Sequence, residues 1–565
     1  MSHGKRAVVC LSSRILLAAF LVYACAAGAQ APQLRPAAPD AIRRWQDMRF
    51  GMFIHWGPVS ITGREIGWSR GAETPVEVYD DLYRQFNPKQ FNAEEWARIA
   101  RDAGMKYLVL VTKHHDGFSM WDTQQTDYNI MRTPFARDVV KELSAACKKY
   151  GIAFGTYYSV CDWHHPDFPL GSPGGKTKKP NPNLDRYTEY LRAQVTELIR
   201  NYGPLLEMWF DVPQETGPER GIPNANLVRS LQPDILINDR AGGTPGDFDT
   251  PEQRIGGFNM ERPWETCMTI CRQWAWKPDD TMKSLQQCLR TLVSTAGGNG
   301  NLLFNVGPMP DGRIEPRQVE RLKEMGAWLK KYGASVYGTR GGPFRTGKWG
   351  ASTRAGNRIY LHVYQWDGTT LQLPAVPAKV TSARVLTGGK LSFQQTGSGL
   401  ALSLAAGDQD PIDTLIALDL DRPAMELAPV RVTVPSASLA ANAQARASNV
   451  YRSNPQYGAE KAVDDDIATR WATDSGTKQA WLEIDLGKPA TFSRVAIREW
   501  EGGGNRVQKF ELQYQDLGSW KTIVSGTTIG TEYIKDFPAV TARIVRLNIL
   551  DATEGPTIDE FEILK

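Results

Sequence analysis

Asp211 is the first residue whose position points to chemistry. It lies near the end of the apolar run 205–212, which reads Leu-Leu-Glu-Met-Trp-Phe-Asp-Val. A buried parallel strand that stops at a carboxylate delivers that group to the open end of a barrel, where barrel enzymes hold their active sites. Asp211 is therefore the leading candidate for a catalytic carboxylate.

Histidines follow other apolar runs in the same way. His55 lies in the run 50–56, and His114 and His115 follow the run 107–113. Histidines at strand ends could bind a metal ion, or could hydrogen-bond sugar hydroxyls through both ring nitrogens. Adjacent residues of a strand point in opposite directions, so His114 and His115 are not expected to hold one ion together. The sequence favours sugar binding, and a metal-dependent hydrolase stays as an alternative.

Tryptophans crowd the same part of the chain. They are Trp56, Trp68, Trp121, Trp163, Trp209, Trp264, Trp274 and Trp276. Indole faces stack on the apolar side of sugar rings, although a tryptophan in a barrel can equally belong to the core. Trp209 stands two residues before Asp211, so both side chains share one face of the expected strand, and Trp209 should border the site.

Alternating strands and helices must position these residues. Asn92 with Glu95 three residues later forms a capping box at the start of one helix. Glycines close this helix and the next two, at Gly104, Gly151 and Gly203. Further strand-like runs are 153–159, 234–240 and 301–305. Strands that alternate with helices predict an α/β fold with a parallel (β/α)-barrel-like catalytic domain and its site at the strand C-termini.

The chain of 565 residues is long enough for two or three domains. We assign residues 30–342 to the catalytic barrel. Residues 343–423 alternate apolar and polar positions between Gly-rich turns, which predicts a small antiparallel β-sandwich. Residues 424–437 contain two prolines and no period, which is typical of a linker. Residues 438–565 contain further short strands and predict a second antiparallel β-sandwich.

The composition describes a globular protein with a small formal net charge of +4. No basic block is concentrated enough to predict a nucleic-acid partner. No run after the first thirty residues reaches the ~18 apolar residues that a membrane span needs. The composition points to a small-molecule or carbohydrate ligand. It does not determine the oligomeric state.

The first 29 residues resemble a secretory signal. Lys5, Arg6 and Arg14 precede an apolar stretch at 15–24, and small residues follow at 26–29. This pattern predicts cleavage after Ala29 and export to the periplasm or the extracellular space. Cys25 makes lipoprotein processing the less favoured alternative, because Tyr23 suits that site poorly.

Five cysteines remain beyond the signal: Cys147, Cys161, Cys267, Cys271 and Cys288. An odd number without a repeated pair predicts buried free thiols rather than a disulfide framework or a zinc site.

Six motifs in order resemble family 29 glycoside hydrolases, the α-L-fucosidases. They are Phe-Gly-Met-Phe-Ile-His-Trp-Gly at 50–57, Thr-Lys-His-His-Asp-Gly-Phe at 112–118, Tyr-Tyr-Ser at 157–159, Trp-Phe-Asp at 209–211, Asn-Asp-Arg at 238–240 and Trp-Glu-Thr-Cys at 264–267. The resemblance spans roughly residues 40–345. It implies a barrel-like catalytic domain, hydrolysis of terminal α-L-fucose with retention of configuration through a covalent glycosyl-enzyme, and no catalytic metal or other cofactor.

The resemblance also implies roles for individual residues. Asp211 would be the nucleophile. The sugar would contact His55, His114, His115, Tyr157, Trp209 and Arg240, with Trp274 beside them. Glu65 and Trp68 match the family's loop acid and tryptophan, although the residues around them depart from the usual pattern.

Two glutamates compete for the acid/base role. Glu252 follows the strand of Arg240 in a loop and resembles the acid/base position of several relatives. Glu265 lies inside an expected strand, where a carboxylate more often orients a neighbour. We favour Glu252, with Glu265 as its rival and Glu261 as a distant third.

The C-terminal region resembles discoidin-like domains, also called coagulation factor 5/8 type C and related to family 32 carbohydrate-binding modules. The segments 462–473 and 481–487 carry this likeness. Such domains often hold a structural calcium ion, for which the candidate ligands are Asp464, Asp466, Thr469 and Glu560. A solvated acidic turn is the competing interpretation. Loop residues that could contact sugars are Tyr451, Arg452, Tyr457, Trp500 and Arg506.

The function expected from the sequence is an exported, retaining exo-α-L-fucosidase that acts on fucosylated oligosaccharides or glycoconjugates. Two alternatives remain at this point. The barrel could belong to an inactive carbohydrate-binding protein or to a metal-dependent hydrolase. Joint presence of Asp211, Glu252 and the three histidines disfavours the inactive form.

Overall fold

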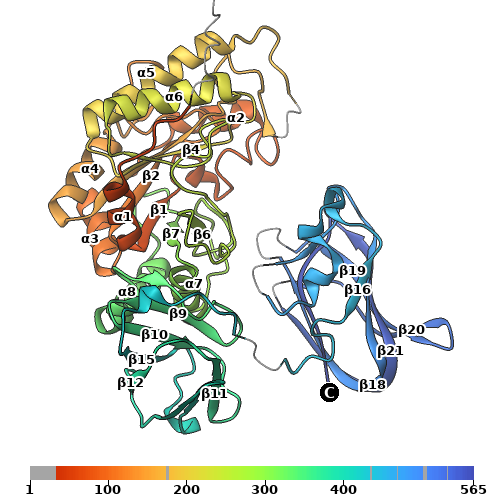
Figure 1. Ribbon diagram of the computed structural model, residues 1–565. Helices are drawn as coiled ribbons and strands as arrows, with labels where there is room; N and C mark the ends of the chain where they lie inside the picture. Colours follow the sequence, from red (N-terminus) through yellow and green to blue (C-terminus); the bar gives the residue numbers. More distant parts are fainter. Residues whose placement is uncertain (1–32, 174–176, 433–435, 467–468, 501–504, 531) are drawn as a thin grey trace, which may run out of the picture.

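A computed structural model describes residues 33–173, 177–432, 436–466, 469–500, 505–530 and 532–565. The chain forms three regions along its length: a helix-covered parallel sheet, a small antiparallel domain and a C-terminal antiparallel domain (Figure 1). This arrangement confirms the expected fold class. The signal predicted for residues 1–29 lies outside the described residues.

The first region is built on a curled sheet of seven parallel strands in the order β5-β4-β3-β2-β1-β7-β6. The strands are β1 (Phe50–Ile54), β2 (Tyr107–Lys113), β3 (Ala153–Ser159), β4 (Glu207–Asp211), β5 (Leu236–Ile237), β6 (Glu265–Thr269) and β7 (Asn301–Val306). Almost every strand residue is buried, because helices cover one face and the other face lines the barrel interior. The expected strands overlap these segments, although β5 covers only two residues of the expected run 234–240. A strand was also expected around Glu265, where β6 lies.

An irregular segment fills the space between β5 and β6. Isolated parallel bridges join Asn238 to Phe248, Asp249 to Trp264 and Glu252 to Cys267. The segment therefore runs alongside both edge strands without forming a regular strand of its own. This course carries Glu252 to the same end of the barrel as the end of β4.

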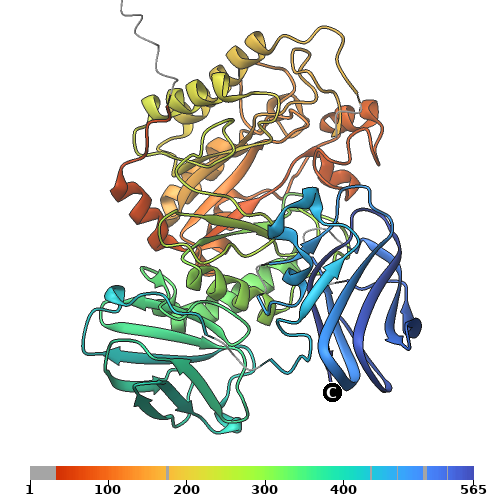
Figure 2. The same ribbon diagram turned by 45° about the vertical axis from the view of Figure 1, so that its right-hand side comes forward.

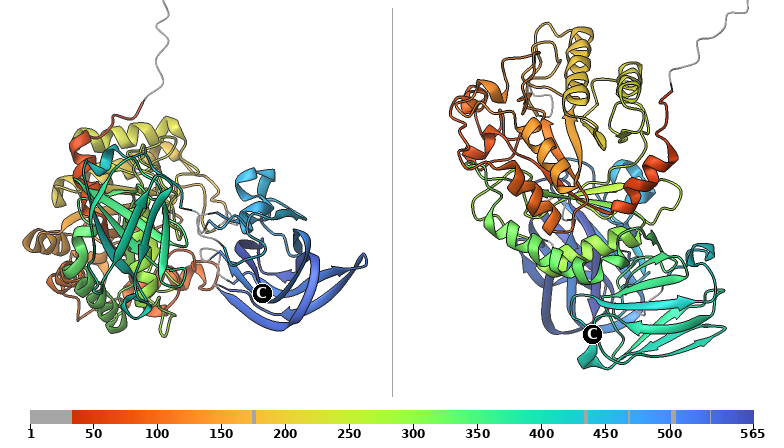
Figure 3. Two further views of the ribbon diagram at one scale, coloured as in Figure 1. Left: turned by 60° about the horizontal axis from the view of Figure 1, so that its bottom comes forward. Right: turned by 90° about the vertical axis from the view of Figure 1, so that its left-hand side faces the viewer.

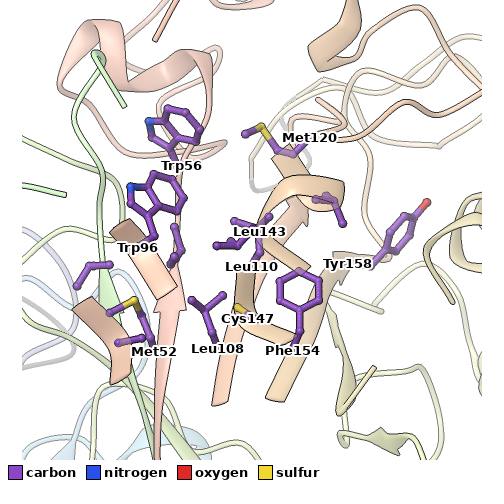
Figure 4. Packing of buried hydrophobic residues seen from close by; sticks show 14 of the residues in the cluster. Met52, Trp56, Trp96, Leu108, Leu110, Met120, Leu143, Cys147, Phe154 and Tyr158 are labelled. Carbon is purple, nitrogen blue, oxygen red and sulfur yellow. The ribbon is translucent and has the colours of Figure 1, made fainter. Parts of the chain in front are cut away.

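Eight α-helices accompany the parallel sheet in the described residues. They are α1 (Pro39–Met48), α2 (Val76–Asp81), α3 (Ala93–Asp102), α4 (Val139–Tyr150), α5 (Leu184–Tyr202), α6 (Pro218–Leu231), α7 (Leu285–Gly297) and α8 (Pro316–Tyr332). The Asn92 side chain caps α3 by accepting from the Glu95 amide, and Gly151 ends α4 in a left-handed conformation. Leu143 and Cys147 of α4 pack on Leu108 and Phe154 of the sheet (Figure 4).

The second region contains two antiparallel sheets, β12-β15-β10-β9-β8 and β11-β14-β13. Its strands are β8 (Arg340–Gly341), β9 (Gly350–Ala355), β10 (Arg358–Val363), β11 (Thr370–Pro374), β12 (Val380–Val385), β13 (Ser392–Thr396), β14 (Gly399–Ser403) and β15 (Thr414–Leu420). Alternating residues of β10, β11 and β14 form its apolar core. Helix α7 contacts β9, so this domain packs against the barrel through α7 and α8 (Figure 3).

The first residues of the segment predicted as a linker pack into the second domain. Ala424 and Leu427 belong to its core, and the Val430 amide donates to the Pro343 carbonyl. Residues 424–432 are thus held by packing and backbone pairing. Residues 433–435 lie outside the described residues.

The C-terminal domain is antiparallel and has its own apolar core. Its strands are β16 (Gln444–Ala447), β17 (Trp471–Ala472), β18 (Ala480–Glu499), β19 (Val507–Asp516), β20 (Ser519–Gly526), β21 (Tyr533–Ala552) and β22 (Thr557–Leu564). Three short helical turns, η8 (Tyr451–Ser453), η9 (Pro455–Tyr457) and η10 (Ala459–Ala462), lie between β16 and β17. The domain lies beside the first two regions (Figure 2).

No helix in the described part of the chain is both long and apolar enough to cross a bilayer. The five cysteines beyond the expected signal are buried free thiols, which confirms their predicted state.

Candidate active site

A cavity of about 400 Å³ opens at the C-terminal ends of the parallel strands. Its polar walls come from His55, His114, His115, Asp211, Arg240 and Glu252. Its aromatic walls come from Phe53, Trp68, Tyr157, Trp209 and Trp274. A larger cavity of about 640 Å³ lies near Gly203–Leu206, at the start of β4, where barrel residues usually serve stability. We therefore assign the chemistry to the smaller cavity.

Asp211 ends β4 and is held from two sides. Arg240 Nη1 donates to its Oδ1 at 2.9 Å, and the Tyr157 hydroxyl donates to its Oδ2 at 2.8 Å. His115 Nε2 lies 3.8 Å from Oδ2. Burial alone would raise the pKa of Asp211, but the charge of Arg240 and the donated hydrogen bonds lower it below its usual range. Asp211 is therefore ionised and oriented toward the cavity.

Glu252 shares the same guanidinium. Arg240 Nη1 also donates to Glu252 Oε2 at 3.0 Å, while Arg240 Nε and Nη2 donate to the hydroxyl and carbonyl of Thr250. One oxygen of each carboxylate lies within 3.0 Å of a single nitrogen, so the two oxygens are separated by less than twice that distance. Retaining glycosidases place their two carboxyl groups ~5 Å apart. The pair has the spacing for that chemistry.

Glu265 is outside the cavity. Its side chain is fully buried, accepts a hydrogen bond of 2.5 Å from the Tyr107 hydroxyl and another of 3.2 Å from Trp209 Nε1. Cys267, two residues further along β6, is the residue of that strand that lines the cavity. Glu265 thus lies one inward-facing position too low to reach a substrate, and its contacts orient Trp209. Glu261 is exposed and also lies away from the cavity lining.

Two histidines have their tautomers set by neighbours. The Asn305 amide donates to the Trp274 carbonyl, so its oxygen is left to accept from His55 Nδ1 at 2.7 Å. The Ser159 hydroxyl donates to the Cys161 carbonyl, so it accepts from His115 Nδ1 at 2.7 Å. Each ring therefore keeps the lone pair on Nε2. Asn305 and Ser159 are positioning residues that lie at the ends of predicted strands, but nothing in their sequence pattern showed this role.

Burial keeps the three histidines neutral. It lowers the pKa of His55 to about 3 and that of His115 to about 4, and it lowers the pKa of His114 as well. The rings of His114 and His115 lie 3.9 Å apart between centroids, and both line the cavity. The expectation that they point in opposite directions is wrong, because both follow the last residue of β2 and no longer obey strand alternation.

Glu65 and Trp68 occupy different positions on the loop after β1. Trp68 lines the cavity, and its ring meets His115 edge to face at 5.2 Å. Glu65 accepts from the backbone amides of Trp274 and Ala275, at 2.8 and 3.0 Å. Burial raises the pKa of Glu65 to about 7. Glu65 therefore holds the Trp274 loop and does not itself line the cavity.

The aromatic wall is a connected set of rings. Tyr157 stacks on Trp209 with centroids 5.5 Å apart, and Trp274 lies 4.8 Å from the ring of His55. Arg240 lies over Trp209 at 4.8 Å. Gly67 is required at this wall, because a Cβ there would lie 2.5 Å from His114 Nδ1 and its φ is +64°. The wall offers apolar ring faces beside neutral hydrogen-bond acceptors.

Two sets of contacts involve the candidate calcium ligands of the C-terminal domain. Thr469 Oγ1 is within 2.7 Å of Asp464 Oδ1, 3.1 Å of the Asp466 carbonyl and 3.3 Å of the Lys461 carbonyl. Glu560 Oε2 is buried without a hydrogen-bond partner, 3.8 Å from Lys348 Nζ of the second domain. Burial raises the pKa of Glu560 to about 8. No group of three or more His, Cys, Asp or Glu arranged for a metal occurs within the described ranges.

The family model described as Alpha-L-fucosidase matches residues 22–334, and the model described as F5/8 type C domain matches residues 444–561. The plasma alpha-L-fucosidase of Homo sapiens is 33% identical over 331 residues, which cover 52% of this chain and 69% of that protein. A putative alpha-L-fucosidase 1 of Oryza sativa subsp. japonica is 27% identical over 540 residues, covering 94% of this chain and 85% of that protein.

Solved structures show the same likeness. The alpha-L-fucosidase isoenzyme 1 of Paenibacillus thiaminolyticus superposes with a TM-score of 0.62 at 33% identity, covering 67% of this chain and 99% of that chain. The alpha-L-fucosidase of Vibrio sp. strain EJY3 shares the fold over 93% of this chain and 94% of its own, with a TM-score of 0.66 at 23% identity.

Proposed function

The chain belongs to the α-L-fucosidase family, glycoside hydrolase family 29, and we propose that it is an exported, retaining exo-enzyme acting through a covalent glycosyl-enzyme. One observation carries the mechanism: Asp211 and Glu252 bind the same nitrogen of Arg240 at the mouth of an aromatic cavity. The spacing of the pair supports retention of configuration.

In the first step, an oxygen of Asp211 forms a bond to the anomeric carbon of fucose. Glu252, in its protonated form, gives its proton to the glycosidic oxygen as the bond between that oxygen and the anomeric carbon breaks. Arg240 and Tyr157 hold Asp211 in place, which reduces the orientational freedom lost on reaching the transition state. The leaving glycan departs with its new hydroxyl, and fucose stays bound to Asp211.

In the second step, the ionised Glu252 takes a proton from a water molecule as that water attacks the anomeric carbon. The bond to Asp211 breaks, and the carboxylate returns to its pairing with Arg240. Two displacements at one carbon restore its original configuration. The same carboxyl group serves as acid and then as base, which requires it to stand at the cavity mouth where water enters. The Glu252 side chain is 43% exposed, as that role needs.

The sugar ring is held by neutral acceptors and aromatic faces. The Nε2 atoms of His55 and His115 can accept from sugar hydroxyls, because their Nδ1 atoms are already engaged. Trp68 and Trp274 supply apolar faces of the kind that stack on pyranose rings. A cavity of about 400 Å³ suits a single terminal sugar, which supports exo-action.

The C-terminal domain is proposed to bind glycan and to hold a calcium ion. Asp464 and Thr469 side chains with the carbonyls of Lys461 and Asp466 present the oxygen ligands that calcium prefers, and the unpartnered Glu560 oxygen lies on the same acidic region. The ion would stabilise this loop and would take no part in hydrolysis.

Location is part of the proposal. The predicted signal at residues 1–29 supports export to the periplasm or the extracellular space, with lipoprotein anchoring at Cys25 as the less favoured route. Amino-terminal sequencing of the mature protein tests this directly. A mature chain that begins near Gln30 supports cleavage after Ala29, whereas a chain that retains Met1 contradicts export.

The mechanism is tested by following the anomer of released fucose with proton NMR during hydrolysis of an aryl α-L-fucoside. Retention predicts α-L-fucose as the first product, before mutarotation produces the β-anomer. First release of the β-anomer contradicts the covalent route. Undiminished rates after exhaustive chelation are expected, and a loss that zinc restores would favour a metal-dependent hydrolase instead.

A further inference from the structure

Trp68 is the most exposed aromatic residue of the cavity wall. Its side chain is 44% exposed, and its ring meets those of His115 and Trp163 edge to face, with centroids 5.2 and 5.4 Å apart. A ring with this exposure gains little from packing, so its own backbone determines where it lies. The position of this wall therefore depends on how residues 65–69, which we call the tryptophan turn, are fixed.

Short-range hydrogen bonds give the tryptophan turn its shape. The Glu65 carbonyl accepts from the Ser69 amide at 3.2 Å and from the Ser69 hydroxyl at 2.6 Å. The Trp68 amide donates to the Ile66 carbonyl at 2.6 Å. These bonds stay within the turn, so they do not fix its place against the other loops of the cavity. That place is set by two side chains, Glu65 and Tyr79.

Tyr79 of α2 connects the tryptophan turn to the loop after β2. Its hydroxyl accepts from the Gly67 amide at 2.8 Å and donates to Asp116 Oδ2 at 2.6 Å. Tyr79 and Asp116 are 2% and 3% exposed, so water competes little for these hydrogen bonds. Asp116 directly follows His115 in the chain. One buried hydroxyl thus joins the tryptophan turn to the loop that bears His115.

Glu65 connects the tryptophan turn to a second loop, the one after β6. Its Oε2 accepts from the Trp274 amide at 2.8 Å, and its Oε1 accepts from the Ala275 amide at 3.0 Å. The Trp274 carbonyl accepts from the Asn305 amide, whose oxygen accepts from His55 Nδ1. Glu65 therefore joins the tryptophan turn to the Trp274 wall and, through that wall, to His55.

Apolar packing joins the tryptophan turn, α2 and the loop after β6. Ile66, Tyr79 and Ala275 belong to one small cluster of buried side chains, and Trp274 packs against that cluster. The hydrogen bonds of Glu65 and Tyr79 thus lie beside a shared apolar contact. Loss of either acceptor would leave backbone amides without partners in this region, which costs more than the hydrogen bond itself contributes.

We propose that Glu65 and Tyr79 are positioning residues for sugar binding, which together hold the tryptophan turn where Trp68 can stack on the bound fucose. This inference rests on the proposed function. Neither Glu65 nor Tyr79 lines the cavity, so each acts through a neighbour: Tyr79 through Trp68, and Glu65 through Trp68 and Trp274. A wall that is fixed before binding loses less conformational entropy when the sugar binds, which raises affinity. The two residues therefore act on KM rather than on kcat.

The test uses the full chain and variants that change one heavy atom. Tyr79→Phe removes only the bridging hydroxyl. Glu65→Gln replaces one acceptor oxygen by an amide nitrogen, which cannot accept a hydrogen bond, so the side chain no longer binds both loop amides. The matched controls are Tyr83→Phe, four residues further along and outside the cavity lining, and Glu73→Gln, whose side chain is 68% exposed.

Three constants are measured for each protein: kcat and KM for an aryl α-L-fucoside, and the inhibition constant of free L-fucose. We expect Tyr79→Phe and Glu65→Gln each to raise KM and the inhibition constant about fivefold, while kcat stays within about twofold of wild type. The two control variants should match wild type in all three constants. A fall in kcat without a rise in KM or in the inhibition constant would overturn the positioning role.

Trp68→Ala shows whether Tyr79 acts through this ring. In that background Tyr79→Phe should change KM no further, because no ring is left to position. Glu65→Gln should keep part of its effect there, since Glu65 also holds the Trp274 loop. A Tyr79→Phe effect of full size in the Trp68→Ala background would mean that Tyr79 does not act through Trp68, and it would overturn the proposal.

Calorimetry shows whether each variant is folded, and Glu65→Gln keeps the experiment decisive if Tyr79→Phe does not fold. An unchanged KM and inhibition constant in folded Glu65→Gln protein, or an equal rise in the control variants, would overturn the inference. Wild-type protein that neither hydrolyses the aryl fucoside nor binds L-fucose would instead refute the proposed function. Normal hydrolysis by wild type with unchanged constants in both variants refutes the positioning role alone.

Discussion

Two pairs of carboxylates lie inside the same barrel in different electrostatic environments. Asp211 and Glu252 share Arg240 at the cavity, whereas Glu207 and Glu265 lie at the starts of β4 and β6 beneath it. Asp211 and Glu207 lie four residues apart on the same face of β4, with Trp209 between them. Burial raises the pKa of Glu265 to about 8 and raises the pKa of Glu207 well above its usual value. The charge of Arg240 lowers the pKa of Asp211 instead.

The difference shows that depth in the barrel alone does not set the charge of a carboxylate. Asp211 is mostly buried, as Glu207 and Glu265 are, but only Asp211 has a cation and several donated hydrogen bonds beside it. The lower pair has only Tyr107 and Trp209 as donors, both to Glu265, and the Glu207 oxygens are unpartnered among the described residues. An ionised Asp211 can act as a nucleophile, and a protonated lower pair can support the wall above it.

The largest expected effect comes from removing the nucleophile. Asp211→Gly should lower kcat by at least ~10³-fold, because no group remains to form the glycosyl-enzyme. Azide fits the space left by the carboxylate and should restore turnover to a β-configured fucosyl azide. Chromatography and NMR identify that product.

Glu207→Gln is the matched control, since it alters a carboxylate of the same strand outside the cavity. We expect its kcat/KM to stay within about threefold of wild type, because an amide preserves the shape of the neutral acid. Near wild-type turnover of Asp211→Gly without azide would remove Asp211 from its role. An equal loss of activity in Asp211→Gly and Glu207→Gln would show that the two carboxylates of β4 do not differ in their roles.

The next effect concerns the cation. Asp211 must be ionised to attack, so activity is present above its pKa and is lost as pH falls through it. Arg240 holds that pKa down. Arg240→Gln should therefore move the acidic limb of the kcat/KM profile upward by ~1–3 pH units, as expected for loss of a neighbouring opposite charge.

Arg240→Lys tests whether charge or geometry dominates. A lysine keeps the positive charge but cannot bind Asp211, Glu252 and Thr250 together as the guanidinium does. We expect its acidic limb to stay near that of wild type while kcat falls. An acidic limb that does not move in Arg240→Gln would show that Arg240 does not keep Asp211 ionised.

The sequence predicted the strands well, because each is a short apolar run that ends on polar residues. It placed Asp211 at the end of a strand, where the structure has it, and Arg240 at the end of a run whose strand, β5, stops three residues earlier at Ile237. It did not predict the depth of Glu265, because strand alternation gives the face of a residue but not its height in the barrel. It could not show how Glu252 reaches the cavity, since the segment between β5 and β6 has no period.

Contacts between distant parts of the chain were also beyond the sequence. The pairing of Lys348 with Asp465 and Glu562 joins two domains and has no local signal. The same holds for Asn305 and Ser159, which set the tautomers of His55 and His115 across neighbouring strands. Local sequence patterns predict which residues form a helix or a strand. The roles of Asn305 and Ser159 depend instead on how neighbouring strands are aligned with one another.

Leaving-group dependence separates the two glutamates that compete for the acid/base role. Loss of a general acid slows poor leaving groups most, because good ones depart without protonation. Glu252→Ala should lower kcat/KM for an oligosaccharide by ~10²-fold or more and spare an activated aryl fucoside or fucosyl fluoride. Glu265→Ala, which releases Trp209, should slow all substrates alike by a smaller factor. The reverse pattern would assign the acid/base role to Glu265.

The smallest expected effect is on stability, and it addresses the lower pair directly. The pKa of Glu265 rises from 4.5 to about 8 on folding, chiefly through burial. A group whose folded pKa is raised contributes stability that is fully present below its unfolded pKa and is lost as pH rises through the folded value. The window for this loss is therefore about pH 4.5 to 8.

The Glu265→Gln variant has no ionisable group at this position. Its stability should therefore not decrease through loss of this proton as pH rises from 4.5 to 8. Relative to wild type, its Tm should rise by about 2–4 °C between pH 5 and pH 9, as followed by calorimetry. Other buried carboxyls with raised pKa values, such as Glu65 and Asp116, are present in both proteins and cancel in the difference. The exposed Glu261→Gln is the control substitution. Parallel Tm curves for Glu265→Gln and wild type across this range would mean that the lower pair is not held protonated, and the contrast with Asp211 would then lack its electrostatic cause.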